Sequence, residues 1–105
     1  MSQFDQVSVV KKGNVFFDGK CVSHSVLFAD GTRKTVGVIL PSTLTFNVGV
    51  PEVMEITDGT CRVKLGHEDE FKTYSAGSQF YVPANGSFVI EANEVVNYVC
   101  SFGSN

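Results

Sequence analysis

The sequence predicts an all-β single domain, either a β-sandwich or a closed jelly-roll barrel, and three observations support this. Apolar and polar residues alternate with a period of two along most of the chain after residue 14. Turn-forming residues interrupt these runs roughly every 8–12 residues. No stretch of about ten residues has the apolar spacing of an amphipathic helix. We therefore expect roughly nine short strands.

The length and composition are those of one ordinary globular domain. The chain has 105 residues, of which 43% are hydrophobic and 18% charged, so it can bury one modest core. Residues 1–13 show no clear period, and we expect them to form an N-terminal arm, either loose or as a short edge strand. Residues 14–105 form the predicted β domain.

Charge and hydropathy exclude several classes of partner. The net charge of -3 and pI near 5.2 argue against nucleic acid, which favours a basic face. No apolar run approaches the ~20 residues that span a bilayer, so we expect no membrane partner. The first residues lack the basic-then-apolar order of a signal peptide. We expect a cytoplasmic protein.

The strands of the first half follow from the alternation. Residues 22–28 alternate up to a turn at residues 29–31, and residues 35–40 form a β-branched run that ends at Pro41. Residues 44–50 then alternate with a clear period of two.

The second half predicts two hairpins and two shorter strands. Asp58 and Gly59 suit a two-residue turn, so residues 53–65 are expected to form a hairpin. Residues 87–92 and 95–102 are expected to form a second one. Short strands are expected at residues 71–74 and 79–82, beyond an acidic, solvated loop at residues 67–70.

The cysteine and histidine residues do not have the sequence spacing of a metal site. Cys21, Cys61 and Cys100 are far apart and lie in apolar runs, which is typical of buried, reduced thiols. His24 lies within a predicted strand and is expected to be half-buried and hydrogen-bonded, while His67 is expected to be exposed. No ligand spacing for a metal is present.

The remaining chemistry depends on arginines and one carboxylate. Arg33 lies just after a turn and could be either a solvated charge or an anion ligand, whereas Arg62 is expected on a solvated strand face. Glu52 shares a strand face with Met54 and Ile56, so it is either a pocket group or a barrel-rim residue.

Several stretches, taken together in order and spacing, resemble one protein family. They are residues 51–59 (PEVMEITDG), residues 77–85 (GSQFYVPAN), Phe17-x-Gly19-Lys20, Val36-Gly37-Val38 and Tyr98-Val99-Cys100. The set is similar to the small single-domain cupins of the pyrimidine/purine nucleoside phosphorylase family, over about residues 14–102.

The resemblance implies a cupin-type jelly-roll β-barrel, a homodimer and a pentosyltransferase activity. The expected reaction is phosphorolysis of purine and pyrimidine nucleosides, with broad base tolerance, to free base and ribose 1-phosphate. Inorganic phosphate is the co-substrate, and no cofactor or metal is implied.

General cupins carry the motifs His-x-His-x(3–4)-Glu-x(6)-Gly and Gly-x(5)-Pro-x-Gly-x(2)-His. Here Glu52 to Gly59 and Gly77 to Pro83 fit the frames, but the histidine positions fall on Thr45, Asn47 and Phe88. A metal held by Glu52 alone is not expected. Residues 46–51 and the turn at residues 83–87 depart from the pattern expected of the family.

The resemblance leads to a hypothesis for the site. Arg33 and Glu52 are the expected catalytic residues: Arg33 holds phosphate, and Glu52 accepts hydrogen bonds from ribose beside a developing oxocarbenium charge. Phosphate binding is assisted by Lys20, Thr35 or Thr45. The base lies against Tyr81, Phe80 or Tyr98, and Asn47 or Asn85 bonds base edges or ribose.

Three other functions stay open. The pocket could bind a metabolite without turnover, as in a non-catalytic small-molecule-binding cupin. The strands could instead form a structural module that mostly makes a dimer. A metal-dependent cupin enzyme is the third alternative.

Overall fold

The protein is built from antiparallel β-strands, as predicted. The computed structural model describes residues 3–103 and contains eleven strands. Within this range there is no α-helix, and one short 3₁₀ turn, η1 (Phe17–Gly19), follows β2. The all-β fold class is therefore confirmed.

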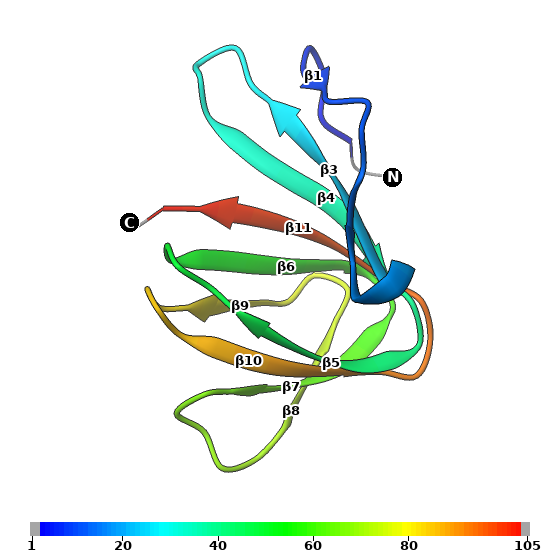
Figure 1. The fold of residues 1–105 in the computed structure, drawn as a ribbon, viewed down its shortest axis with the longest axis vertical. Coiled ribbons are helices and arrows are strands. Elements are labelled where there is room, and N and C mark those ends of the chain that lie inside the picture. The colour runs from blue at the N-terminus through cyan, green and yellow to red at the C-terminus, as the bar shows by residue number, and fades with distance from the viewer. Residues whose placement is uncertain (1–2, 104–105) are drawn as a thin grey trace.

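The larger sheet has seven strands in the order β1-β3-β4-β11-β6-β9, with β2 also paired to β3. Figure 1 shows β3, β4, β11, β6 and β9 in succession from top to bottom. Their bounds are β1 (Ser8–Val9), β2 (Asn14–Phe16), β3 (Cys21–Leu27), β4 (Arg33–Ile39), β6 (Glu52–Asp58), β9 (Gln79–Val82) and β11 (Val96–Phe102).

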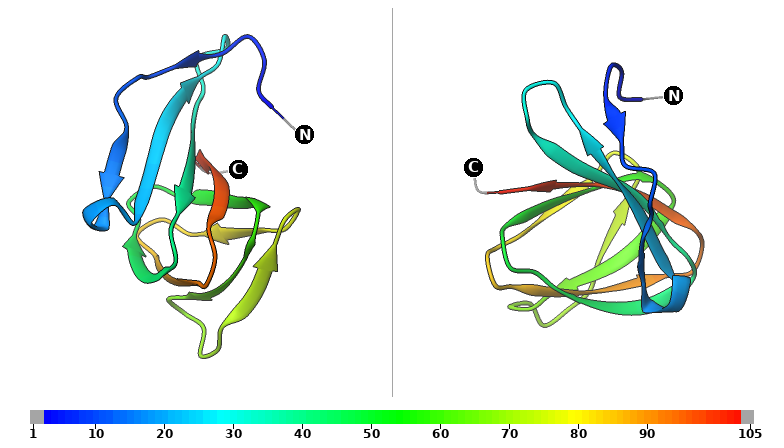
Figure 2. Two further views of the ribbon diagram at one scale, coloured as in Figure 1. Left: turned by 90° about the vertical axis from the view of Figure 1, so that its right-hand side faces the viewer. Right: turned by 45° about the horizontal axis from the view of Figure 1, so that its top comes forward.

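The smaller sheet has four strands in the order β5-β10-β7-β8. They are β5 (Ser42–Asn47), β7 (Thr60–Leu65), β8 (Lys72–Ser75) and β10 (Ser87–Ala92). This sheet lies across from β11, β6 and β9, while β1 to β4 extend beyond it (Figure 2). Backbone pairing is not continuous around the two sheets, so they form a cupin-like sandwich and not the closed barrel named among the predictions.

Both predicted hairpins are wrong, although their strands are right. β6 pairs with β11 and β9, whereas β7 pairs with β10 and β8. The chain therefore changes sheet at Gly59, whose φ is +88°. β10 and β11 likewise belong to different sheets. A turn between two alternating runs predicts a hairpin from local sequence alone. Here each run pairs instead with strands from elsewhere in the chain.

The other strand predictions agree with the structure within a few residues. The run expected at residues 44–50 is shorter, because β5 ends at Asn47 and a bend follows. Part of the expected arm is an edge strand: β1 pairs with the end of β3. Residues 1–2, which belong to the same predicted arm, lie outside the described residues.

The core lies between the two sheets and is formed by the inward-facing residue of each alternating pair. Aromatic rings pack in series through it: Phe46 stacks on Phe88, Phe88 meets the edge of Phe80, and Phe80 contacts Tyr74. The largest fully buried side chains are Phe88, Ile39, Ile56, Ile90, Val63, Val82, Val96 and Cys21.

The predictions for cysteine and histidine hold. Cys21, Cys61 and Cys100 are all buried free thiols. His24 is partly buried, and its Nδ1 lies 3.2 Å from the carbonyl oxygen of Val10, which ties the N-terminal segment to β3. His67 falls in the loop after β7 and is exposed, as predicted.

In the part of the chain between residues 3 and 103, no helix has the length and apolar character needed to cross a membrane.

Candidate functional site

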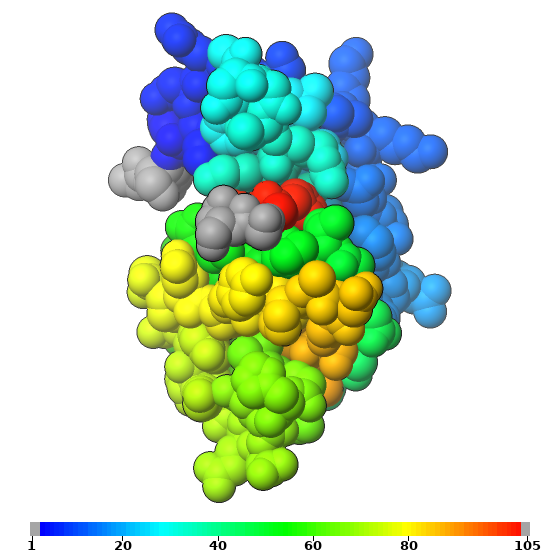
Figure 3. Space-filling view, turned by 90° about the vertical axis from the view of Figure 1, so that its left-hand side faces the viewer, coloured from blue at the N-terminus to red at the C-terminus, as the bar shows by residue number. Residues whose placement is uncertain are grey.

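A cavity of about 350 Å³ lies on the inner face of the larger sheet. Several of its residues lie at the end where β11 stops and β6 begins. Figure 3 looks onto this end, where the red end of β11 lies between the cyan β4 region above and the yellow β9 region below. The lining residues are Asn14, Phe16, Ser23, Arg33, Thr35, Phe46, Asn47, Val48, Glu52, Met54, Phe88, Tyr98, Cys100 and Phe102. We call this the inner cavity.

Five of the nine side chains expected in the site line the inner cavity. They are Arg33, Thr35, Asn47, Glu52 and Tyr98. They come from four strands: β4 holds two of them, the next strands β5 and β6 hold one each, and the distant strand β11 holds one. Thr35 is buried and Arg33 is exposed, so the set runs from the interior to the rim.

The other four expected residues do not line the cavity. Thr45 is exposed because β5 turns its neighbours Leu44 and Phe46 inward. Tyr81 is 49% exposed on the outer face of β9. Asn85 has a φ of +58°, which Asn tolerates, and belongs to the exposed turn before β10. Lys20 is exposed just after η1.

Arg33 is held from two sides at the rim. Its guanidinium carbon lies 4.4 Å from the centroid of the Phe102 ring, and its Nη1 donates to Ser25 Oγ at 3.3 Å. Guanidinium groups have five N–H donors in one plane, so stacking on a ring leaves the edge of the plane for an anion.

Glu52 is a half-buried carboxyl group in the same row of inward-facing side chains. It pairs with Phe102 across β6 and β11. Burial raises the pKa of Glu52 above its ordinary value, and a hydrogen bond from the Cys100 thiol opposes this shift in part. The same burial, with the nearby Glu52 charge, raises the pKa of Cys100, so that this thiol stays protonated.

Tyr98 lies deeper in the cavity. Its hydroxyl is 3.4 Å from the sulfur of Cys21 on β3. Burial raises the pKa of Tyr98 well above its ordinary value, so the phenol is neutral and can donate a hydrogen bond. The side chain crosses Gly37, which is its partner on β4.

Sequence reasoning missed most of the apolar wall of the cavity. Phe16, Phe46, Phe88 and Phe102 all line it. Phe46 and Phe88 stack at 5.0 Å with their planes 14° apart, and Phe16 is 46% exposed. The alternation within each strand could have identified Phe46, but Phe16 depends on the pairing of β2 with β3.

Comparison with known proteins assigns the chain to a family. The family model for pyrimidine/purine nucleoside phosphorylase matches residues 11–102. The chain belongs to the pyrimidine/purine nucleoside phosphorylase family. A protein of that name from Cupriavidus metallidurans is 68% identical over 103 residues, which cover 98% of this chain and all of that protein. One from Thiobacillus denitrificans is 67% identical over 98% of this chain and 100% of its own.

Solved structures agree with the fold of this nucleoside phosphorylase family member. A protein of unknown function from Acinetobacter sp. ADP1 is 55% identical, with a TM-score of 0.93 over 95% of this chain and 97% of that one. The EutQ protein of Clostridium difficile has a TM-score of 0.62 over 84% of this chain and 73% of that one, at 12% identity, and shows a similarity of fold alone.

In this family member, apolar side chains occupy the positions that cupins use for metal ligands. With three residues before Glu52, the first motif places its histidines at Phe46 and Val48, which line the cavity, and the second places its histidine at Phe88. The alternative spacing, which placed them at Thr45 and Asn47, is wrong for Thr45 because that side chain is exposed on the other face of β5. The described lining residues therefore include one carboxylate and no histidine, and the Cys100 thiol is protonated, so they do not supply the histidine ligands of those motifs.

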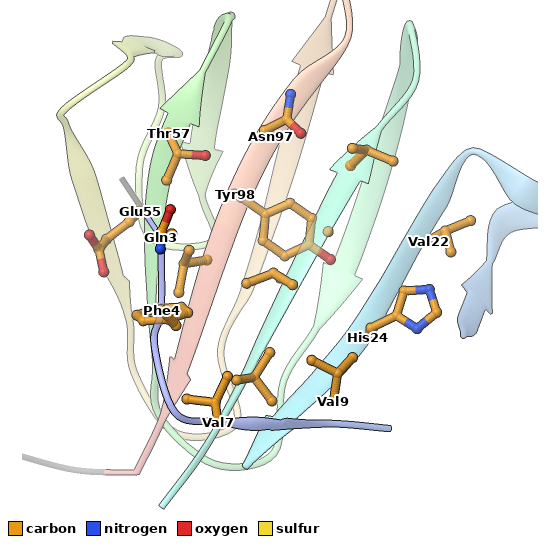
Figure 4. A pocket seen from close by; sticks show the side chains of 15 residues that line it. Gln3, Phe4, Val7, Val9, Val22, His24, Glu55, Thr57, Asn97 and Tyr98 are labelled. Carbon is orange, nitrogen blue, oxygen red and sulfur yellow. The ribbon is translucent and has the colours of Figure 1, made fainter. Parts of the chain in front are cut away.

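A second cavity of about 710 Å³ lies on the outer face of the larger sheet, where the N-terminal segment crosses it (Figure 4). Valines from β3, β4 and β11 line it, together with Phe4 and Val7. Glu55 and His24 lie near its edges in Figure 4. We call this surface the outer groove. Unlike the inner cavity, it has no arginine among the described residues that line it.

Proposed function

We propose that the protein is a pentosyltransferase that cleaves purine and pyrimidine nucleosides with inorganic phosphate, giving free base and ribose 1-phosphate. Family membership supports a nucleoside phosphorylase. The observation that carries the finer proposal is the inner cavity, in which a single cation and a single carboxylate flank one aromatic ring.

Arg33 is the proposed phosphate ligand. An exposed guanidinium edge suits two phosphate oxygens at once. The hydroxyl of Thr35 lies farther in on the same strand face and is available as a further donor. In the reaction, a phosphate oxygen forms a bond to ribose C1′ as the C1′–N bond breaks. The electron pair of that bond goes to the base nitrogen, which takes up a proton.

Glu52 is the proposed ribose ligand. Its ionised form accepts hydrogen bonds from ribose hydroxyls and stabilises the positive charge that develops at C1′. Burial of this carboxyl group strengthens such an interaction, because the local dielectric is lower than in water.

The aromatic wall supports binding of the base by its flat face. Phe16, Phe46 and Phe102 line the cavity with aromatic rings. Asn14 and Asn47 line it as well, and each lies within two residues of one of these phenylalanines in the sequence. Stacking on a ring tolerates any base, whereas hydrogen bonding to base edges selects among them. This replaces Tyr81 and Phe80 as proposed base contacts, since Tyr81 is outside the cavity and Phe80 is in the core.

We propose that the reaction needs no metal, because the ligand positions of the cupin motifs hold apolar residues. We also propose a homodimer, with the apolar outer groove as the contact surface between copies. Sedimentation equilibrium of the purified protein tests the dimer: a mass near 11.4 kDa would contradict it. The three buried free thiols favour a reducing, cytoplasmic location.

The deciding experiment incubates the purified protein with inosine or uridine, with and without phosphate. Free base should appear only with phosphate, together with ribose 1-phosphate in equal amount. Absence of phosphate-dependent base release from every nucleoside would contradict the proposal. Nucleoside binding without turnover would instead favour the non-catalytic binding protein.

A further inference from the structure

Arg33, Phe102 and Glu52 form one row across three neighbouring strands. β4, β11 and β6 are adjacent in the larger sheet. Phe102 pairs directly with Glu52 on one side, and its ring lies 4.4 Å from the Arg33 guanidinium on the other. The uncharged ring thus lies between the cation and the carboxylate of the inner cavity.

The row keeps the two charges apart. Strands are about 4.8 Å apart, so residues two strands apart have backbones separated by roughly 10 Å. Among residues 3–103, ion pairs are formed by Arg62 with Glu91 and by Lys72 with Glu68, and Arg33 takes part in neither. A long Arg side chain could reach across this distance, but the guanidinium is instead stacked on Phe102.

Ser25 is the second group that contacts the Arg33 guanidinium. Its hydroxyl accepts from Arg33 Nη1 at 3.3 Å. The contact with the ring holds one side of the guanidinium, and this hydrogen bond restrains its rotation. The remaining N–H donors are then directed away from the two holding groups.

We propose that Phe102 and Ser25 are positioning residues for phosphate: they hold the Arg33 guanidinium ready for the anion and keep it from pairing with Glu52. This rests on the proposed function of Arg33 and Glu52 as phosphate and ribose ligands. Without the ring, the guanidinium turns toward the carboxylate, and the ion pair neutralises both ligands before substrate arrives.

The test measures phosphate binding by isothermal titration calorimetry, and KM and kcat in phosphorolysis. Phe102→Leu should weaken phosphate binding about three- to thirtyfold, the range expected for a cation–π contact, and should raise the phosphate KM more than it lowers kcat. Phe102→Tyr keeps the ring face and should bind like wild type. Ser25→Ala should weaken binding by a few-fold, as expected for one hydrogen bond.

Two further variants separate positioning from a structural effect. Phe71→Leu is the matched control, because Phe71 stacks on Arg62 at 4.9 Å outside the cavity. It should leave phosphate binding unchanged. In Phe102→Leu, the added change Glu52→Gln should restore phosphate affinity, because the competing carboxylate is gone.

The outcomes are distinct from those that test the proposed function. Unchanged phosphate affinity in Phe102→Leu, or no recovery with Glu52→Gln, would overturn the positioning role, and so would a wild-type protein that does not bind phosphate. Wild-type protein that binds phosphate without releasing base would contradict the phosphorylase, while the dissociation constants of the variants would still decide the role of Phe102.

Discussion

Gly37 lies directly beneath the Tyr98 side chain on the inner face of the larger sheet. A Cβ atom at Gly37 would lie 2.8 Å from the Tyr98 hydroxyl and 2.7 Å from the carbonyl oxygen of Val22. The two residues are partners across β4 and β11. Glycine is required here because the Tyr98 hydroxyl and the Val22 carbonyl oxygen lie too close for a Cβ atom. A positive φ is not the reason, because Gly37 has none.

Gly37→Ala should destabilise the protein by about 1–3 kcal/mol, as expected for overpacking. The added methyl group meets the backbone of Val22 as well as the Tyr98 hydroxyl, so rotation of one side chain cannot relieve the overlap. Thermal unfolding measures the change. Gly49→Ala is the control, because nothing lies within 4 Å of a Cβ there. Equal melting temperatures for both variants would contradict this packing.

Arg33→Met should lower phosphorolysis by about 10²–10³-fold, because one charged ligand of the reacting anion is lost. The fold should be retained, since Arg33 is exposed at the rim. Arg62→Met is matched to it, because Arg62 also stacks on a phenylalanine but lies outside the cavity. Initial rates at saturating nucleoside measure the effect. Similar losses in both variants would argue against a phosphate site at Arg33.

Activity should rise with pH through the raised pKa of Glu52, which lies above its ordinary value of 4.5. The proposed role needs the ionised carboxylate, so protonation on the acid side removes it. A profile of kcat/KM against pH measures this, and the acid limb should be absent in Glu52→Gln at its lower residual rate. An acid limb that is unchanged in the variant would assign the titration to another group.

The same shift predicts a pH dependence of stability. Because burial raises the folded pKa of Glu52, its contribution to stability is fully present below about pH 4.5 and is lost as the pH rises through the raised value. Glu52→Gln escapes this loss. The melting temperature of Glu52→Gln minus that of wild type should therefore increase from acid to neutral pH. A difference that shrinks over this range would contradict the burial of the carboxyl group.

Phe16→Ala should raise the KM for nucleosides by about five- to a hundredfold, as expected for loss of a base-stacking surface, with little change in the phosphate KM. Phe16 is 46% exposed, so the fold should tolerate the change. Tyr81→Ala is the control, since this ring has similar exposure on the outer face. If Tyr81→Ala has the larger effect, the base lies elsewhere.

Treatment with a chelating agent should leave phosphorolysis unchanged. The positions that supply metal ligands in other cupins hold Phe46, Val48 and Phe88, and these bind no cation. Rates before and after dialysis measure the effect, with added Mg²⁺ or Zn²⁺ as the comparison. Loss of activity that a divalent metal restores would show that the reaction uses one.

The period of two predicted the strands because side-chain alternation is a local property of the backbone. It also shows which residues share a face: Glu52 with Met54, and Phe46 with Leu44. The cupin motif with four residues before Glu52 places a metal-ligand position at Thr45. The alternation places Thr45 on the exposed face of β5. The alternation was the better guide, because one face of β5 must be buried.

Strand partners were decided by the tertiary structure. The Asp58-Gly59 turn is a good local hairpin signal, yet β6 and β7 lie in different sheets. A strand is stabilised by every partner along its length, and β6 gains two partners, β11 and β9, that the sequence places far away.

The sequence by itself determined the all-β class, most strand positions, the family and the importance expected of Arg33 and Glu52. Only the tertiary structure decided that Phe102 lies between these two charges and that Tyr81 lies outside the cavity. The physical reason is that alternation fixes only the face on which a side chain lies. Its neighbours on that face come from other strands, whose register depends on packing of the whole core.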